Sequence, residues 1–234
     1  MTYCMADIHG NYEAYQDILH QIHFTEADTL YVLGDVIDRG QNSMQILFDM
    51  MLRPNVIPII GNHEYMGLQC LRLLSSEITE DSIGQLDEGI IQGLLEWQNV
   101  GGQATIDEFH KLSKEEKQDV LEYLEEFSLY EEVNVGGKQY VLVHAGLGNF
   151  HPQRQLDDYE LHEIAFTAAH YDEMYFSDKI VVTGHVPTRN IMDNPRLDYI
   201  YKANNHIAID CGCGYGGQLG CICLDTGKEY YSKK

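Results

Sequence analysis

Residues 34–40 read Gly-Asp-Val-Ile-Asp-Arg-Gly and directly follow the apolar run Thr29-Leu30-Tyr31-Val32-Leu33. Two aspartates three apart, an arginine and a glycine at each end are more than packing requires. A short apolar run that ends in a polar turn is typical of a buried strand, and in open α/β sheets ligands gather beyond the carboxyl ends of the strands. The stretch therefore predicts a strand followed at once by a ligand site.

The same pattern occurs twice more in the first third of the chain. A short run, Thr2-Tyr3-Cys4-Met5, leads into Asp7-Ile8-His9-Gly10, and Val56-Ile57-Pro58-Ile59-Ile60 leads into Gly61-Asn62-His63-Glu64. Apolar residues at helical spacing follow each polar turn. This alternation predicts a mixed α/β fold, with crossover units on a sheet that has much parallel pairing and all three polar turns beyond the carboxyl ends of its strands.

Residues 76 to about 130 have a different character, because they are charged, helical in pattern and poor in β-branched residues. Within them, Ser113-Lys114-Glu115-Glu116 has the form of a capping box. We expect a helical insertion or cap beside the site.

Strand-type runs return in the last 100 residues, at 139–144, 179–185, 207–210 and 221–224. The last two flank the glycine-rich segment 212–220 and are followed by Asp225-Thr226-Gly227, which predicts antiparallel strands joined by turns. At 234 residues the chain is long enough for a sizeable core and short enough for one domain, 1–234.

The composition disfavours several classes of partner. The formal net charge is −22, from 37 Asp and Glu against 15 Lys and Arg, whereas nucleic-acid and anionic membrane surfaces bind clustered cations. No run approaches the ~18 apolar residues of a membrane span, and a candidate site residue at Asp7 leaves no room for a signal peptide. Six cysteines without a leader indicate reduced thiols. We expect no nucleic acid, no membrane and a cytoplasmic location.

Metal-type ligands follow five separate strand-type runs. Imidazole, carboxylate and amide groups without thiolate suit manganese, iron or zinc. Any one of these residues alone could be a satisfied turn residue. Together they exceed the needs of one ion and suit two ions about 3.5–4 Å apart that share a carboxylate. These residues are Asp7 and His9, Asp35 and Asp38, Asn62 and His63, His144, and His185.

The ordered motifs resemble a known family. Asp7-x-His9-Gly10, the 34–40 stretch, Gly61-Asn62-His63-Glu64, His144-Ala145-Gly146 and Gly184-His185 are similar to motifs of the phosphoprotein phosphatase family of metallophosphoesterases, in its compact bacterial form. Two further segments, residues 97–102 and the glycine-rich run after Ile209-Asp210, extend the resemblance over nearly the whole chain. It implies a calcineurin-like fold, in which mixed β-sheets pack as a sandwich flanked by helices.

The resemblance also implies a dinuclear site. Asp7, His9 and Asp35 would hold the first ion, while Asp35, Asn62, His144 and His185 would hold the second. Two divalent ions are expected, with manganese preferred and iron or zinc as alternatives. A metal-bridged hydroxide would attack phosphorus directly, with no phosphoenzyme intermediate.

Three residues receive catalytic roles from the same resemblance. His63 would protonate the leaving group, and Asp38 would orient its ring and raise its pKa. Arg39 would present a planar fork of donors to phosphate oxygens, so Arg39, Asn62 and His63 form the expected substrate contacts. Glu64 is interpreted as a brace for the loop, and Trp97 as a packing anchor.

The sequence departs from the family in one respect that concerns substrate. Relatives carry a second phosphate-binding arginine around the position of Phe166-Thr167-Ala168-Ala169-His170, where this chain has none. Arg154 and Arg189 are candidate substitutes. A lost charge-assisted contact would cost about 1.5–3 kcal/mol, which weakens phosphate binding without removing the metal chemistry.

Two cysteine pairs, Cys211-x-Cys213 and Cys221-x-Cys223, allow two interpretations. Their spacing departs from the C-x₂₋₄-C pattern of zinc sites, so we interpret them as small buried residues, with zinc as the alternative. If both pairs lie on strands, alternation places each pair on one face.

Three functions follow from these motifs. The leading hypothesis is a metal-dependent protein phosphatase acting on phosphoserine or phosphothreonine, or on phosphotyrosine, with a phosphoprotein or a small phosphoester as its substrate. The alternative enzyme is a dinucleoside polyphosphate hydrolase that cleaves diadenosine tetraphosphate. The alternative of another class is a non-catalytic, metal-bound phosphate sensor.

Overall fold

The computed structural model describes residues 1–75 and 88–233, and its first sheet has the strand order β10-β9-β1-β2-β3. The first three strands are parallel, with Thr2 opposite Thr29 and Leu30 opposite Val56. The predicted crossover units on a parallel sheet are therefore confirmed. The five strands are β1 (Thr2–Met5), β2 (Thr29–Leu33), β3 (Val56–Ile59), β9 (Gly220–Cys223) and β10 (Glu229–Tyr231).

The second sheet has the order β4-β5-β6-β8-β7. Its three central strands are parallel, and the two edge strands run antiparallel to their neighbours. The carboxyl ends of β5 and β6 thus lie at one edge of this sheet. The strands are β4 (Tyr130–Val135), β5 (Lys138–Val143), β6 (Lys179–Thr183), β7 (Tyr201–Ala203) and β8 (His206–Ala208).

The two sheets pack face to face around a shared apolar core. Cys4 and Leu33 of the first sheet meet Leu142 and Val182 of the second in this core. Neighbours along the strands, such as Met5 and Val32, point to the opposite face, as the period-two geometry of a strand requires. Because both faces of β1 and β2 are buried, their sequences are continuously apolar. The predicted sandwich of mixed sheets flanked by helices is confirmed.

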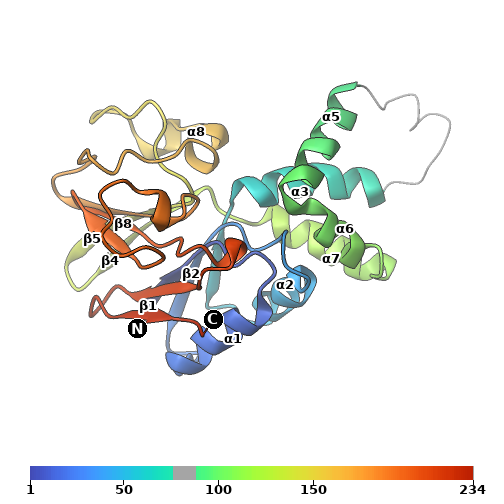
Figure 1. The fold of residues 1–234 in the computed structure, drawn as a ribbon, viewed down its shortest axis with the longest axis horizontal. Coiled ribbons are helices and arrows are strands. Elements are labelled where there is room, and N and C mark those ends of the chain that lie inside the picture. Colours follow the sequence, from blue (N-terminus) through green and yellow to red (C-terminus); the bar gives the residue numbers. More distant parts are fainter. Residues whose placement is uncertain (76–87, 234) are drawn as a thin grey trace.

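A layer of helices covers the outer face of the first sheet (Figure 1). Two of these helices are the crossovers between β1, β2 and β3, and the others follow β3 along the chain. Trp97, Phe109 and Tyr15 are fully buried in this layer. Its members are α1 (Tyr12–Gln21), α2 (Ser43–Met51), α3 (Asn62–Ser75), α5 (Glu88–Trp97), the π-helical turn η1 (Gln98–Gly102), α6 (Gln103–Phe109) and α7 (Lys114–Glu125).

Helices occupy most of residues 88–125 of the stretch that was expected to be helical, and residues 76–87 lie outside the described part of the chain. The role of this stretch as an insertion or cap stays a prediction. The capping box is present, since Glu116 N donates to Ser113 Oγ at 3.2 Å and Ser113 N donates to Glu116 Oε2 at 2.8 Å. In the parts of the chain that the structure describes, no helix combines the length and apolarity needed to cross a bilayer.

A smaller layer covers the outer face of the second sheet (Figure 1). Val141 and Val143 of β5 pack there against Leu156 and Ile164. The layer includes the 3₁₀ turn η2 (Leu156–Asp158) and helix α8 (Leu161–Ala165), and two further 3₁₀ turns, η3 (Thr188–Asn190) and η4 (Cys213–Tyr215), lie between strands near the chain's C-terminus.

The expectation for the last two strand-type runs was wrong in part. The run at 207–210 contributes to β8 in the second sheet, whereas the run at 221–224 forms β9 in the first, so the two are not paired with each other. The glycine-rich segment between them carries the chain from one sheet to the other. The antiparallel turn was correctly expected only for β9 and β10, where Ile222 lies opposite Glu229.

Candidate active site

Five loops converge where the carboxyl ends of the central strands of both sheets meet. The loops after β1 and β2 run side by side, with Asp7 N donating to Gly34 O at 3.0 Å and His9 N donating to Asp35 O at 2.9 Å. From the second sheet, Gly184 N after β6 donates to His144 O after β5 at 2.8 Å. Every residue expected at the metal site lies on one of these loops or at the first turn of the helix after β3.

The backbone of these loops is held in an unfavourable conformation. Eleven non-glycine residues in the described chain have positive φ, and six of them belong to the candidate site. Such angles cost roughly 1–3 kcal/mol each and persist only where the surrounding structure imposes them, so their concentration marks a functional site. The six are Asp7, His9, Asp35, Asp38, Arg39 and His185.

Close packing around Asp35 explains one of the motif glycines. A Cβ atom on Gly61 would lie 2.3 Å from Asp35 Oδ1 and 2.5 Å from Asp35 N. Any larger residue at position 61 would push the loop after β2 out of place. The glycine is therefore needed for the approach of two strand ends rather than for a turn.

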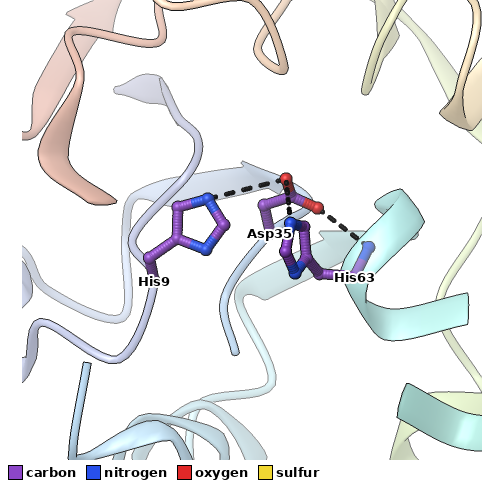
Figure 2. A group of neighbouring side chains, drawn as sticks. All are labelled: His9, Asp35 and His63. Atoms are coloured by element: carbon purple, nitrogen blue, oxygen red, sulfur yellow. Dashed lines mark hydrogen bonds and ion pairs between the residues drawn. The ribbon is translucent and has the colours of Figure 1, made fainter. Parts of the chain in front are cut away.

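Asp35 is the centre of the site and has histidines on both sides. Its Oδ2 lies 3.6 Å from His9 Nε2 and 3.9 Å from His63 Nε2 (Figure 2). Its Oδ1 lies 3.4 Å from His144 Nε2. His63 N also donates to Asp35 Oδ1 at 3.2 Å. A carboxylate whose two oxygens face separate groups of imidazoles has the geometry of a bridging ligand.

The second group of donors faces Asp35 Oδ1. Asn62 Oδ1 lies 3.0 Å from His144 Nε2 and 3.1 Å from His185 Nδ1. These three side chains come from the ends of β3, β5 and β6, and their donor atoms converge on one point beside Asp35. The structure thus brings together the four residues predicted for the second ion.

Hydrogen bonds to backbone carbonyls set the orientation of two of these rings. His144 Nδ1 lies 2.7 Å from Leu33 O, and His9 Nδ1 lies 3.0 Å from Ile37 O. A proton on Nδ1 satisfies each carbonyl and leaves the Nε2 lone pair directed at Asp35 and its surroundings. This arrangement, with one nitrogen held by a carbonyl, is typical of histidines that bind metals.

The protonation states of the histidines divide them into two kinds. Burial lowers the pKa of His9 to about 3 and that of His185 to about 4, and it also lowers the pKa of His144. These rings are neutral at neutral pH, as metal ligands must be. Burial opposes protonation of His63 as well, but the charge of Asp35 and the hydrogen bond to Asp38 outweigh it and raise its pKa. His63 is therefore suited to hold a proton.

Asp38 is held so that it can support His63. Its Oδ2 accepts from His63 Nδ1 at 2.6 Å and from Trp97 Nε1 at 2.7 Å, while its Oδ1 accepts from Thr105 Oγ1 at 2.6 Å. Trp97 is fully buried, as expected of a packing anchor, but its hydrogen bond to Asp38 was not anticipated. Thr105 matches no motif, and no sequence signal identifies it.

Arg39 extends from the same loop across the mouth of the site. Its Nη2 lies 3.1 Å from His63 Nε2, its Nη1 contacts His9 Nε2, and its guanidinium lies 4.1 Å above the ring of Tyr215. Arg39 N donates to Gly101 O at 3.0 Å, which ties the loop to η1. The side chain can reach a phosphate bound beside His63.

Glu64 braces the loop, as the sequence predicted. Its carboxylate accepts from the backbone N–H groups of Asp35 at 2.7 Å, Val36 at 2.7 Å, Ile37 at 3.2 Å and Gly61 at 3.0 Å. Burial raises its pKa to about 7, although the backbone donors oppose that shift.

Asp7 is placed differently from the other predicted ligands. Both of its oxygens accept from His185 N, at 3.1 and 3.0 Å, and it belongs to neither of the two metal-type groups among the described residues. Burial, together with the negative charges of Asp210 and Asp35, raises its pKa well above the ordinary value. Asp7 thus lies at the edge of the site, and its role as a ligand stays a prediction.

Asp210 is a neighbour of the candidate site to which the sequence motifs assigned no role. It is buried, its Oδ1 accepts from Gly212 N at 2.8 Å, and burial raises its pKa to about 7. The sequence signal was present, because Asp210 directly precedes the glycine-rich segment and follows a strand.

Neither candidate for a second phosphate-binding arginine is free. Arg154 Nη1 donates to Glu163 Oε1 at 2.8 Å, and Arg189 Nε donates to Asp198 Oδ1. Arg39 is therefore the only arginine that contacts the predicted site residues within the described chain.

The cysteines do not form a metal site among the described residues. All six are buried and free, and none belongs to a metal-type group. Cys221 and Cys223 share one face of β9, as expected, whereas Cys211 lies in the core between the sheets and Cys213 in the helical core. Contrary to the expectation, Cys211 and Cys213 do not share one face, because residues 211–213 are not in a strand.

The donor set fits two divalent cations. In each of two groups, His9–Asp35–His63 and Asp35–His144–His185, the donor atoms lie within 4.8 Å of one another, and Asp35 belongs to both. The amide of Asn62 adds a donor to the second group. Burial of Asp7, Asp35 and Asp210 in one region creates repulsion that cations would offset.

The sequence is similar to a known protein family and to named relatives. A model of the family described as calcineurin-like phosphoesterase matches residues 2–211. The symmetrical bis(5'-nucleosyl)-tetraphosphatase of Acidovorax sp. (strain JS42) is 30% identical over 147 residues, which cover 62% of this chain and 43% of that protein. The enzyme of the same name from Delftia acidovorans (strain DSM 14801 / SPH-1) is 32% identical over 98 residues, 41% of this chain and 35% of that protein. The matched segments thus span less than half of these relatives.

Solved structures resemble this one over nearly the whole chain. A crystal structure described as a candidate diadenosine tetraphosphatase has a TM-score of 0.67 at 20% identity, covering 98% of this chain and 91% of that chain. A protein serine/threonine phosphatase from Saccharomyces cerevisiae has a TM-score of 0.59 at 12% identity, covering 100% of this chain and 79% of that chain. At such identities the likeness establishes the fold alone.

Proposed function

Because the chain belongs to the calcineurin-like phosphoesterase family, we propose that it is a metal-dependent hydrolase that cleaves phosphoanhydride bonds of dinucleoside polyphosphates. One observation carries the hydrolytic part of this proposal. Asp35 joins two groups of metal-type donors, Arg39 lies beside them, and one member of the first group, His63, has a raised pKa that suits it to donate a proton. Such an arrangement suits displacement at phosphorus.

The choice of substrate rests on the named relatives. The two relatives described above are named bis(5'-nucleosyl)-tetraphosphatases, which supports the hypothesis of a dinucleoside polyphosphate hydrolase over that of a protein phosphatase. The protein phosphatase hypothesis has the support of fold likeness only. The preferred substrate is thus a phosphoanhydride rather than a phosphoprotein.

The site residues divide the work of hydrolysis among them. His9, Asp35, Asn62, His144 and His185 would hold two divalent ions, with Asp7 as a further candidate ligand and manganese as the preferred metal. When bound, these ions would supply an acidified water and neutralise phosphate charge. Among the chain's own groups, Arg39 would bind a non-bridging phosphate oxygen.

His63 would act on the leaving group. Its ring is held by Asp38 through Nδ1, and Nε2 would carry a proton for the leaving group once Arg39, whose Nη2 lies 3.1 Å from Nε2, turns to the phosphate, because two donors cannot share that contact. Transfer of that proton to the departing oxygen completes cleavage of the P–O bond. With diadenosine tetraphosphate, addition of water across the central anhydride gives two molecules of adenosine diphosphate.

Product analysis tests this proposal directly. The protein with manganese is incubated with diadenosine tetraphosphate or with a phosphoserine peptide, and the products are separated by anion-exchange chromatography. We expect adenosine diphosphate as the sole nucleotide product and a higher kcat/KM than for the peptide. Faster turnover of the peptide would establish a protein phosphatase, and no turnover of either would favour the phosphate sensor.

Two variants connect the activity to the site. Asp35→Asn and His63→Asn should each lower kcat/KM by at least about a hundredfold, since one removes the shared ligand and the other the proton donor. His151→Asn changes an exposed histidine outside the site and serves as the matched control.

A further inference from the structure

Three rings form an exposed cluster beside the second group of donors. The rings of Tyr65 and Phe166 meet edge to face with centroids 5.9 Å apart, and those of Phe166 and His162 are stacked with centroids 5.1 Å apart and planes 2° apart. Tyr65 is 36% exposed, His162 is exposed and Phe166 is half-buried. We call these residues the ring cluster.

Packing does not account for the ring cluster. None of its three members belongs to any of the three hydrophobic cores that the described residues form. Within the same part of the chain, the Tyr65 hydroxyl has no hydrogen-bond partner. Large aromatic side chains bury more apolar surface than other residues, so rings left together at the surface of a monomer point to a ligand.

The ring cluster is connected to the candidate site through two elements, α3 and α8. Tyr65 follows Asn62 by three residues on α3, so the two side chains lie on one face of the helix. The segment after His144 is tied to α8, with Ala145 N donating to Ile164 O at 2.9 Å and Gly148 N to Glu163 O at 3.0 Å. Tyr65 thus lies on the helix that begins at Asn62, and Phe166 directly follows α8, which is hydrogen-bonded to the segment after His144.

The charge of the protein explains why uncharged contacts would matter here. The chain carries a formal charge of −22, and Arg39 is its one arginine in contact with the described site residues. Arg154 and Arg189 are occupied by carboxylates. A polyphosphate therefore finds few cations from the chain outside the metal site, and affinity has to come from another part of the substrate.

We infer that the ring cluster is a stacking platform for a nucleobase of the substrate, an inference that rests on the proposed function. Every nucleobase has a π-face, and stacking on aromatic side chains is the usual way in which proteins bind bases without reading their sequence. The phosphates would then lie at Asp35 and Arg39 while one base covers Tyr65 and Phe166. Tyr65 and Phe166 would determine specificity for nucleoside over inorganic polyphosphates.

Kinetics with and without a base test the inference. We compare kcat/KM for diadenosine tetraphosphate with that for inorganic tetraphosphate, in the wild type, in Tyr65→Leu and in Phe166→Leu. Leucine keeps apolar bulk but has no π-face. Each variant should lose about tenfold or more on the dinucleotide relative to its loss on inorganic tetraphosphate, mainly through KM. Equal losses on the two substrates would overturn the inference.

Conservative and distant replacements serve as controls. Tyr65→Phe keeps the ring and should restore the preference for the dinucleotide that Tyr65→Leu loses. Tyr230→Leu removes a ring that packs edge to face with Tyr3, away from the site, and should leave the ratio of the two kcat/KM values at that of the wild type. Far-UV circular dichroism and thermal unfolding verify that each variant is folded.

A binding measurement separates this inference from the proposed function. Adenosine diphosphate and inorganic pyrophosphate are titrated calorimetrically into the manganese-loaded wild type and Phe166→Leu. A loss of affinity about tenfold greater for adenosine diphosphate supports the platform even if diadenosine tetraphosphate is not hydrolysed. If the dinucleotide is hydrolysed but both affinities change equally, the proposed function stands and the platform does not.

Discussion

Four histidines surround Asp35, and their neighbours shift their pKa values in opposite directions. His9, His144 and His185 are buried without a charged partner strong enough to offset desolvation, so their pKa values fall. His63 is equally buried but hydrogen-bonds to Asp38, and its pKa rises. One residue type would thereby supply both the proposed metal ligands and the proposed proton donor.

Replacing Asp38 should change the pH dependence of turnover. A general acid is active when protonated, so kcat falls as the pH rises through the pKa of His63. Asp38→Asn removes a charge that raises this pKa, and the basic limb of the profile of kcat against pH should move to lower pH. At neutral pH we expect a loss of about tenfold to a hundredfold, measured with diadenosine tetraphosphate.

The matched control for that prediction is Asp107→Asn, which removes the same charge from an exposed position on α6. Its profile should coincide with that of the wild type. An unchanged basic limb in Asp38→Asn would show that His63 is not the group that titrates.

At the scale of elements, helix α3 shapes the loop that follows β2. The sequence pattern had placed Asn62-His63-Glu64 in a polar turn before the helix. In the structure the helix begins at Asn62, so these three residues form its first turn. From this first turn Glu64 accepts four backbone N–H groups, three of them in the loop. The helix thus holds Asp35 in its positive-φ conformation.

Glu64→Gln should therefore destabilise the protein and weaken metal binding. The glutamine amide presents donors to backbone N–H groups that need acceptors, and buried unsatisfied groups cost about 1–3 kcal/mol. We expect a loss of about 2–3 kcal/mol in the free energy of unfolding, measured by urea denaturation. Weaker manganese binding by calorimetry should accompany it.

Glu125→Gln is the appropriate comparison, because Glu125 pairs with Arg72 at the surface, where both are about half exposed. An exposed ion pair contributes less than about 1 kcal/mol. If the two variants lose the same stability, Glu64 does not support the loop as inferred.

At the scale of the whole molecule, the site joins the two sheets. His9, Asp35 and Asn62 follow strands of the first sheet, whereas His144 and His185 follow strands of the second. A cation bound between them would link the sheets at the edge where the core between them ends. Metal binding should accordingly stabilise the fold as well as support catalysis.

Manganese should raise the midpoint of thermal unfolding. A ligand that binds only the folded state at about a hundred times its Kd contributes about 2.7 kcal/mol. We expect this rise in the wild type and in His151→Asn, and its loss in Asp35→Asn, as measured by calorimetry with and without manganese chloride. A full rise in Asp35→Asn would contradict the assignment of Asp35 as the shared ligand.

Much of this architecture is local in origin and could be predicted. The runs 2–5 and 29–33 are apolar because both faces of their strands are largely buried, the run 56–60 is buried at Val56, Ile59 and Ile60, and each run ends in the turn that carries candidate ligands. Ser113 and Glu116 lie close enough in sequence to form their capping box without help from other elements. Periodicity and capping are local properties, so the strands and the capping box that they predict are confirmed.

The rest depended on contacts between distant segments. The strands at 206–208 and 220–223 look like partners in sequence, but they pair in different sheets because β6 and β1 offer them parallel and antiparallel edges. Thr105 reaches Asp38 from 67 residues away, and Phe166 meets Tyr65 from a hundred residues away. No spacing rule connects such residues.

The amino-acid sequence by itself indicated the strands, the alternation of strand, polar turn and helix in the first half of the chain, and the residue types of the candidate site, since these follow from periodicity and from residue types placed at strand ends. The tertiary structure alone decided which side chains surround Asp35, which histidine has a raised pKa, and which rings lie beside the site. Those outcomes depend on burial and on distances of a few ångströms between loops of two sheets, and such quantities exist only once the chain has folded.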